Sequence, residues 1–192
     1  MLILARHGQT SVNAGGRLQG RADAPLTDLG RRQADAIAAV VGTPALVVAS
    51  PLRRARETAA RINADVVVDE RWIELDYGEW DGMPLSDVPA AAWQAWRHDP
   101  SFAPPGGESL VDLGARVRPA CEELRETAAG ADVVVVSHVS PIKAAAAWAL
   151  GTHDEVSWRM FLDVAAISRI RTGMPGPSLV AWNDRCHLAL LD

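Results

Sequence analysis

The stretch ADVVVVSHVSPIKAAAAWALG, residues 131–151, reads as a strand that leads at once into a helix. Residues 132–136 are one aspartate followed by four valines, the pattern of a strand buried on both faces. Ser140 and Pro141 are expected to open the helix, because proline is tolerated at the first helical position, and Gly151 is expected to end it. A buried strand joined directly to a helix is typical of an α/β fold.

The same alternation continues in both directions from this unit. Further strands are expected at residues 2–5, 45–49, 66–68, 167–171 and 179–182. Helices are expected at residues 27–41 with Thr27 as N-cap, from Ser50 as N-cap with Pro51 in first position, at 89–98, and from Ser109 to Ala129 with a kink at Pro119. This order predicts a mainly parallel sheet with helices on both faces.

Composition narrows the class of protein. Hydrophobic residues make up 48% of the 192 residues and charged residues 22%, a balance typical of a soluble globular chain. We expect one domain over residues 1–192, with an excursion rich in proline and tryptophan at about 83–105. The 24 acidic and 19 basic residues give a net charge of −5, which argues against nucleic acid or an anionic membrane as partner. The start resembles no signal peptide, and Cys121 and Cys186 fit two reduced thiols, so a cytoplasmic location is expected.

Histidines and arginines follow the predicted strands. Arg6 and His7 come after the first strand, Arg53 and Arg54 after the second, and His138 after the strand at 132–136. In such folds ligands bind at the carboxyl ends of the parallel strands, where these residues meet. The sequence therefore predicts an anion site on one edge of an otherwise acidic protein.

The order of these motifs resembles the histidine phosphatase superfamily, the group of the cofactor-dependent phosphoglycerate mutases. The matching segments run nearly end to end: Arg6-His7-Gly8, Asn13, Gln19-Gly20, Pro25-Leu26-Thr27 with Gly30, Ser50-Pro51-Leu52-Arg53-Arg54-Ala55, Glu74 to Gly82, Gly106 to Ser109, Ser137-His138 and Trp182-Asn183. The resemblance implies a three-layer αβα sandwich whose mainly parallel central sheet has an antiparallel edge strand. It selects Arg54 over Arg53, and it places Asn13, Gln19 and Gly20 at a phosphate.

Phosphoryl transfer needs an in-line nucleophile, positive charge around the phosphoryl oxygens and a proton for the leaving oxygen. His7 can be the nucleophile and form a phosphohistidine, provided that a hydrogen bond to its other nitrogen fixes the tautomer. Arg6 and Arg54 can bind phosphate in bidentate fashion, and His138 is expected to be a third donor, as an imidazolium when phosphate is bound. These groups supply the positive charge, so neither a metal nor another cofactor is implied.

Glu74 is the expected general acid in the first step and general base in the second. A carboxyl group that holds a proton near neutral pH needs burial or a negative neighbour, which Trp72, Tyr77 and bound phosphate would supply. Asp76 is the nearest rival, and the resemblance selects Glu74.

The second histidine is followed by Val139-Ser140-Pro141, where many family members have glycines. Because Pro141 lacks a backbone donor, anion contacts there are expected from Val139 or Ser140. This version resembles some α-ribazole-phosphatase-like domains.

Three functions remain open from the sequence. The favoured one is a phosphomonoesterase for a small phosphorylated metabolite, because the excursion is short and nothing long closes over the site. The alternative is a phosphoglycerate-mutase-type phosphotransferase, and a non-catalytic binding module is third. Contacts of Trp93, Trp96, Arg17 and Arg21 with substrate stay open, and a homodimer is possible.

Overall fold

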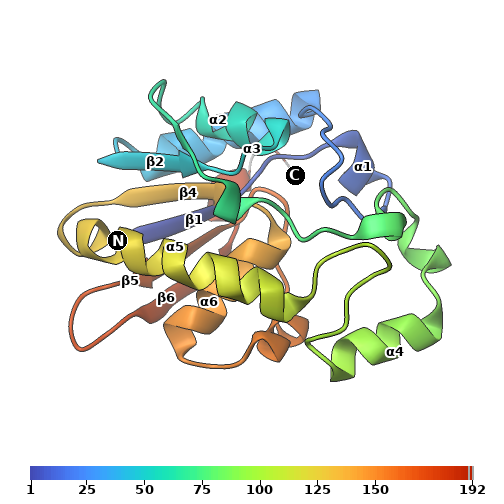
Figure 1. Cartoon of the computed structure of the whole chain (residues 1–192). Coiled ribbons are helices and arrows are strands. Elements are labelled where there is room, and N and C mark those ends of the chain that lie inside the picture. Colours follow the sequence, from blue (N-terminus) through green and yellow to red (C-terminus); the bar gives the residue numbers. More distant parts are fainter. Residues whose placement is uncertain (190, 192) are drawn as a thin grey trace.

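The computed structural model describes residues 1–189 and 191, which form a six-stranded sheet in the order β3-β2-β4-β1-β5-β6 (Figure 1). The strands are β1 (Leu2–Arg6), β2 (Leu46–Ala49), β3 (Val67–Val68), β4 (Val133–Ser137), β5 (Ile167–Arg171) and β6 (Ser178–Asp184). The first four run parallel, whereas β5 is antiparallel to β1 and β6 is antiparallel to β5. The predicted mainly parallel sheet with an antiparallel edge is confirmed.

Helices cover both faces of the sheet. The helices are α1 (Ser11–Ala14), α2 (Asp28–Val41), α3 (Arg53–Ala59), α4 (Ala90–His98), α5 (Leu110–Gly130) and α6 (Val139–Leu150). Short 3₁₀ turns are η1 (Glu70–Trp72), η2 (Gly78–Trp80), η3 (Leu85–Asp87), η4 (Asp154–Arg159) and η5 (Cys186–Leu188). Figure 1 shows α2 and α3 on one face of the sheet and α5 and α6 on the other.

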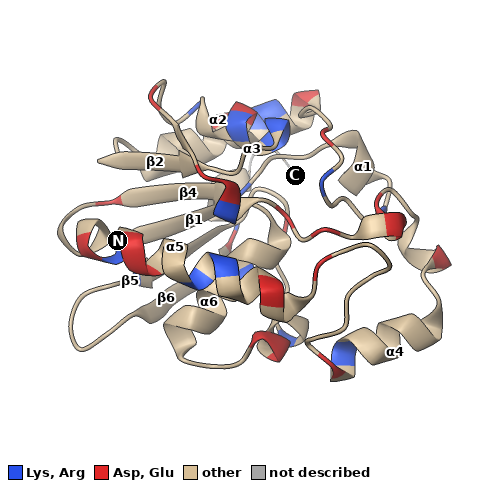
Figure 2. Ribbon diagram, viewed as in Figure 1, with Lys and Arg blue, Asp and Glu red and all other residues tan. Residues whose placement is uncertain are grey.

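Two apolar cores explain these layers, because successive side chains of a strand point to opposite faces. Leu4 of β1 belongs to the core that also contains Val117 of α5 and Ile142 of α6. Ala5, the next residue, belongs to the opposite core with Ile37 of α2. Strands β2 and β4 contain no charged residue, which Figure 2 shows as tan ribbons between charged helices. The charges of the site therefore come from strand ends, loops and helix starts.

Two predicted caps are confirmed and two helix starts are wrong. Thr27 Oγ1 accepts from the Gly30 amide at 3.0 Å, and Ser109 Oγ accepts from the Asp112 amide at 3.1 Å. Helix α3 begins at Arg53 with Leu52 as N-cap, so Ser50 does not cap it; Ser50 faces the site instead. Helix α6 begins at Val139, before Ser140, and α5 continues through Pro119.

The excursion at 83–105 carries η3 and α4, which lies to one side of the sheet (Figure 1). Its aromatic side chains pack together, since the Trp93 and Trp96 rings stack with centroids 5.6 Å apart. Trp158 of η4 meets Trp96 edge-on at 5.3 Å, which attaches the excursion to the body. Within the part of the chain that the structure describes, no helix has the length and hydropathy to span a bilayer.

Candidate active site

The predicted site residues meet at the carboxyl edge of the parallel strands. His7 follows β1, His138 follows β4, and Arg54 lies in the first turn of α3, after β2. The rings of His7 and His138 lie 5.0 Å apart, and the Arg54 guanidinium contacts both. The topology thus gathers residues that are up to 131 positions apart.

His7 is held as one defined tautomer. Its Nδ1 donates to the Gly8 carbonyl at 2.7 Å, and a carbonyl oxygen only accepts, so Nδ1 carries the proton. Nε2 is left with its lone pair, which accepts from Arg54 Nε at 3.2 Å. Burial, followed by the charges of Arg54 and Arg6, holds the pKa of His7 well below its ordinary value. The ring therefore presents an unprotonated nitrogen, as a nucleophile requires.

Arg54 is fully buried and bridges the two histidines. Its Nε also donates to His138 Nδ1 at 3.2 Å, while its two terminal nitrogens donate to the carbonyls of Ala22 at 2.8 Å and Gly20 at 2.7 Å. Arg53 is exposed and pairs with Glu57 at 2.6 Å. The placement agrees with the choice of Arg54 over Arg53.

His138 is also neutral in this arrangement. Because Nδ1 accepts from Arg54, Nε2 carries the proton and donates to Ser50 Oγ at 2.6 Å. Burial lowers the pKa of His138 well below its ordinary value, and Arg54 lowers it further. An imidazolium at this position requires the negative charge of a bound phosphate.

Both histidines make stability depend on pH. Since their folded-state pKa values are lowered, the unfolded chain takes up protons below pH 6.5 while the folded protein does not. We expect the free energy of unfolding to fall with decreasing pH, by up to about 1.4 kcal/mol per pH unit for each histidine. Urea unfolding between about pH 7.5 and pH 5.5 measures the slope. ¹⁵N NMR that found both rings protonated at pH 6 would contradict this expectation.

Three buried donors beside His7 lack partners. Among residues 1–189 and 191, Arg6 Nε, Asn13 Nδ2 and Gln19 Nε2 make no hydrogen bond. Thr10 fixes both amides, because its backbone N–H donates to Asn13 Oδ1 at 3.2 Å and its hydroxyl donates to Gln19 Oε1 at 2.6 Å. Unpartnered buried donors are costly, and three of them around one point suit an anion with several oxygens.

Glu74 is buried at the start of α6. Its Oε1 accepts from the Leu75 amide at 2.8 Å and the Ser140 amide at 3.1 Å, and its Oε2 accepts from the Val139 amide at 3.1 Å. Three donors and a helix N-terminus stabilise the negative charge of this carboxylate. Val139, expected to contact phosphate, gives its N–H to Glu74 in this structure, because the carboxylate is the anion that lies nearest.

Three other sequence-predicted residues lie outside the cavity that Glu74 faces. Asp76 Oδ2 forms an ion pair with Arg21 at 3.1 Å, and Arg21 also pairs with Glu108 at 3.4 Å. Gly20 does not line the cavity but positions Arg54 through its carbonyl. A Cβ at Gly20 would lie 2.9 Å from the Tyr77 ring, which explains a glycine there.

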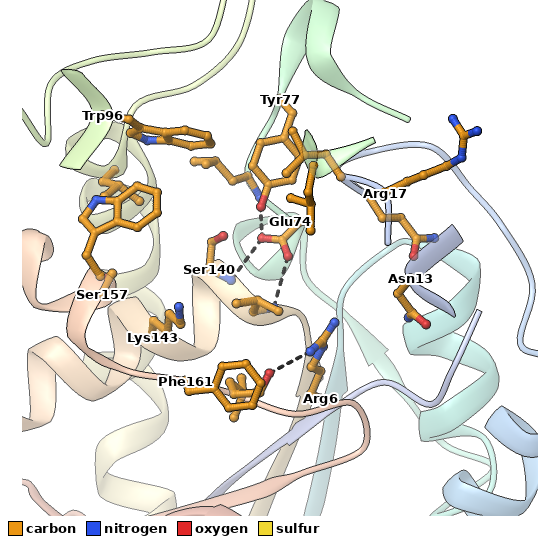
Figure 3. Close-up of a pocket in the computed structure, with 18 of the residues that line it drawn as sticks. Arg6, Asn13, Arg17, Glu74, Tyr77, Trp96, Ser140, Lys143, Ser157 and Phe161 are labelled. Atoms are coloured by element: carbon orange, nitrogen blue, oxygen red, sulfur yellow. Dashed lines mark hydrogen bonds between the residues drawn. The ribbon is translucent and has the colours of Figure 1, made fainter. Parts of the chain in front are cut away.

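His7 lines a cavity with a volume of about 320 Å³. Figure 3 shows this cavity in close-up. The polar residues that line it include Arg6, Asn13, Arg17, Gln19, Glu74 and Tyr77. Trp93 and Trp96 also line it, so they serve both as packing and as cavity wall. Sequence reasoning missed several further lining residues, among them Lys143, Trp158, Phe161 and Leu162. Lys143 alone had a sequence signal, because it stands one helical turn after Val139.

Two glycines bring the loop after β1 against α2. A Cβ at Gly8 would lie 2.3 Å from the Gly30 carbonyl oxygen, and a Cβ at Gly30 would lie 2.1 Å from the Gln9 carbonyl oxygen. A retreat of the Gly8 backbone would move His7, its neighbour in the chain. Because the two backbones lie this close, neither position has room for a side chain.

Within the described residues, no three His, Cys, Asp or Glu side chains are grouped so that they could hold a metal ion. Positive charge at the site comes from Arg6 and Arg54, both buried enough for desolvation to lower their pKa values, which the nearby Glu74 charge partly opposes.

Comparisons with known proteins agree with this geometry. The chain matches the histidine phosphatase superfamily (branch 1) over residues 2–185. Glucosyl-3-phosphoglycerate phosphatase of Mycolicibacterium vanbaalenii is 46% identical over 166 residues, which cover 78% of this chain and 74% of that protein. Phosphoserine phosphatase 1 of Hydrogenobacter thermophilus is 34% identical over 199 residues, covering 97% and 93%.

A solved structure of a mycobacterial glucosyl-3-phosphoglycerate phosphatase in complex with VO₃ has a TM-score of 0.88 at 36% identity, covering 96% of this chain and 98% of that one. The chain spans about half the length, 49%, of the bifunctional protein Rv2228c of Mycobacterium tuberculosis, to which 87% of it aligns at 41% identity.

The fold and the family model agree on the class of protein. The chain belongs to the histidine phosphatase superfamily, as the order of its motifs predicted.

Proposed function

We propose that this protein hydrolyses a small phosphorylated metabolite through a phosphohistidine on His7. The observation that carries the proposal is the fixed tautomer of His7, whose Nε2 lone pair lies beside Arg54. Around it stand the unpartnered donors of Arg6, Asn13 and Gln19, which suit phosphoryl oxygens.

In the first step His7 Nε2 attacks phosphorus, and the bond from phosphorus to the leaving oxygen breaks. The N–H of Arg54 Nε, which donates to His7 Nε2 in the free enzyme, then donates to a phosphoryl oxygen instead. The incoming dianion competes with Glu74 for the N–H groups of Val139 and Ser140, so Glu74 takes up a proton on binding. It passes that proton to the leaving oxygen.

In the second step water attacks the phosphohistidine. Glu74, now a carboxylate, accepts the proton of the water while the phosphorus–nitrogen bond breaks and His7 regains its lone pair. Inorganic phosphate then leaves. His138 and Arg54 hold the phosphoryl oxygens in both steps, and the charge of the phosphoryl group favours the imidazolium form of His138.

The cavity supports hydrolysis over return of the phosphoryl group to a bound acceptor. Leu85 and Phe161 line it and are 46% and 72% exposed, so water has access to His7 from this side. A mutase must exclude water while its intermediate lasts.

A phosphate-release screen tests the proposal. It should cover sugar phosphates, phosphoglycerates, phosphoserine, nucleotides, α-ribazole phosphate and glucosyl-3-phosphoglycerate, together with p-nitrophenyl phosphate. A parallel mutase assay, with and without a bisphosphoglycerate primer, tests the alternative that the protein is a phosphoglycerate-mutase-type phosphotransferase. Acid-labile label on His7 after rapid quench supports the intermediate, and mutase turnover faster than phosphate release would overturn the proposal.

We expect activity to survive removal of metal. Arginine and histidine side chains supply the positive charge that other phosphoryl-transfer enzymes take from Mg²⁺. Prolonged dialysis against EDTA, followed by assay in metal-free buffer, should change the rate by less than about twofold. Loss of activity that returned only with Mg²⁺ or Zn²⁺ would show that this account of the charge is wrong.

A further inference from the structure

Lys143 is the only lysine in the chain, and the mechanism above does not use it. It stands in α6 one helical turn after Val139, whose backbone N–H donates to Glu74. Its side chain lines the cavity. In Figure 3 Lys143 lies near Ser157, on the side of the cavity away from Asn13 and Arg17.

Lys143 differs from the other charged groups of the cavity. Arg6 donates to the Leu162 carbonyl at 2.7 Å, Arg17 donates to the Gly82 carbonyl at 2.8 Å, and Glu74 accepts three amides. Over the described part of the chain, Lys143 has no hydrogen-bond or ion-pair partner. A partly buried ammonium without a partner costs free energy, which an anion on a ligand would offset.

The charge around Lys143 has the sign that an anion requires. Three cations, Arg6, Arg17 and Lys143, line the cavity against the single carboxylate of Glu74, in a chain of net charge −5. Burial lowers the pKa of Lys143, Arg6 acts in the same direction, and Glu74 opposes them. A second negative charge close to Lys143 would favour its protonated form.

The wall beyond Lys143 is apolar and aromatic, formed by Trp93, Trp158, Phe161 and Leu162. Among the described cations of the cavity, Lys143 is the one without a hydrogen-bond or ion-pair partner, so it is available to a leaving group that extends from His7 past Glu74. The unpartnered donors of Arg6, Asn13 and Gln19 remain for the phosphoryl oxygens.

We propose that Lys143 binds an anionic group on the leaving-group part of the substrate, either a carboxylate or a second phosphate. The enzyme then prefers phosphate esters of acidic molecules over esters of neutral ones. This inference rests on the proposed phosphatase function, since it concerns the part of the substrate that departs from His7.

Matched substrate pairs test Lys143. The carboxylate pair is 3-phosphoglycerate and glycerol 3-phosphate, and the second-phosphate pair is fructose 1,6-bisphosphate and fructose 6-phosphate. The wild-type protein should favour the acidic member of at least one pair, in kcat/KM, by about tenfold or more. The pair that shows the preference identifies the anion.

Three variants test whether Lys143 causes the preference for acidic substrates. Lys143→Met keeps the length of the side chain without its charge and should reduce the acidic-to-neutral ratio by about 10- to 100-fold. Lys143→Arg should keep most of the ratio. Arg17→Met removes an exposed cation of the cavity and should reduce the ratio less than Lys143→Met. An equal loss on both members of each pair, or a wild type without preference, would overturn the inference.

Hydrolysis of p-nitrophenyl phosphate by the wild type separates the two proposals. If it occurs without any acidic preference, the phosphatase proposal stands and the role of Lys143 falls. If no phosphate ester is hydrolysed, both fall. Because the chain has one lysine, ¹³C reductive methylation labels only Lys143 and the amino terminus. The Lys143 signal should then move on addition of glycerate and not of glycerol.

Discussion

Replacement of His7 by alanine should abolish turnover, with a loss of at least about 10³-fold in kcat on every phosphate ester. Gly8 and Arg54 orient the ring of His7, and its Nε2 is the unprotonated nitrogen that shares the cavity with the unpartnered donors of Arg6 and Asn13. Steady-state phosphate release measures the loss. No labelled phosphoenzyme should form in a rapid-quench experiment.

The fold should survive this change because His7 lies at the end of β1 and contacts mainly the site itself. Circular dichroism and urea unfolding check this point. His98→Ala is the matched control, since His98 is exposed on α4 and bonds only to the Gln94 carbonyl of its own helix, at 2.7 Å. A folded His7→Ala protein with more than a few per cent of the wild-type rate would remove His7 as nucleophile.

The sheet and the grouping of the site were predictable because both depend on short-range patterns. Apolar runs of four or five residues mark the buried strands, and in a parallel sheet the residues after them must lie at one edge. That rule alone places His7, Arg54 and His138 together. The choice of Arg54 over Arg53 came from motif resemblance and stays a prediction. In the structure Arg54 is buried beside both histidines, whereas Arg53 is exposed.

Contacts between distant segments were not predictable. Ser50 before Pro51 has the local pattern of a helix cap, yet its hydroxyl is used by His138, 88 residues away. The Val139 amide follows a strand like a phosphate donor, but it binds Glu74 from another loop. Lys143 was overlooked because its significance depends on the absence of a partner among the described residues, which only packing reveals.

Glu74→Gln should separate good leaving groups from poor ones. A sugar alkoxide needs a proton in the transition state and p-nitrophenolate needs almost none, so only the former depends on a general acid, whose contribution is about 10²–10⁴-fold. Glutamine keeps the size of the side chain but cannot transfer the proton. Phosphohistidine formation should therefore slow by about that factor on alkyl phosphates and far less on p-nitrophenyl phosphate.

The measurement must isolate the first step, because Glu74 also acts as base in the second and its loss slows both substrates at steady state. Rapid-quench counting of labelled phosphoenzyme does so. Glutamine keeps one oxygen for the Leu75 and Ser140 amides but sets its NH₂ group against the Val139 amide, so some loss unrelated to proton transfer is expected. That loss affects both substrates alike and cancels in their ratio. Asp76→Asn is the matched control, since this carboxylate pairs with Arg21 outside the cavity and should leave the ratio unchanged. If Glu74→Gln instead slows the first step equally on alkyl and aryl phosphates, Glu74 does not donate the proton.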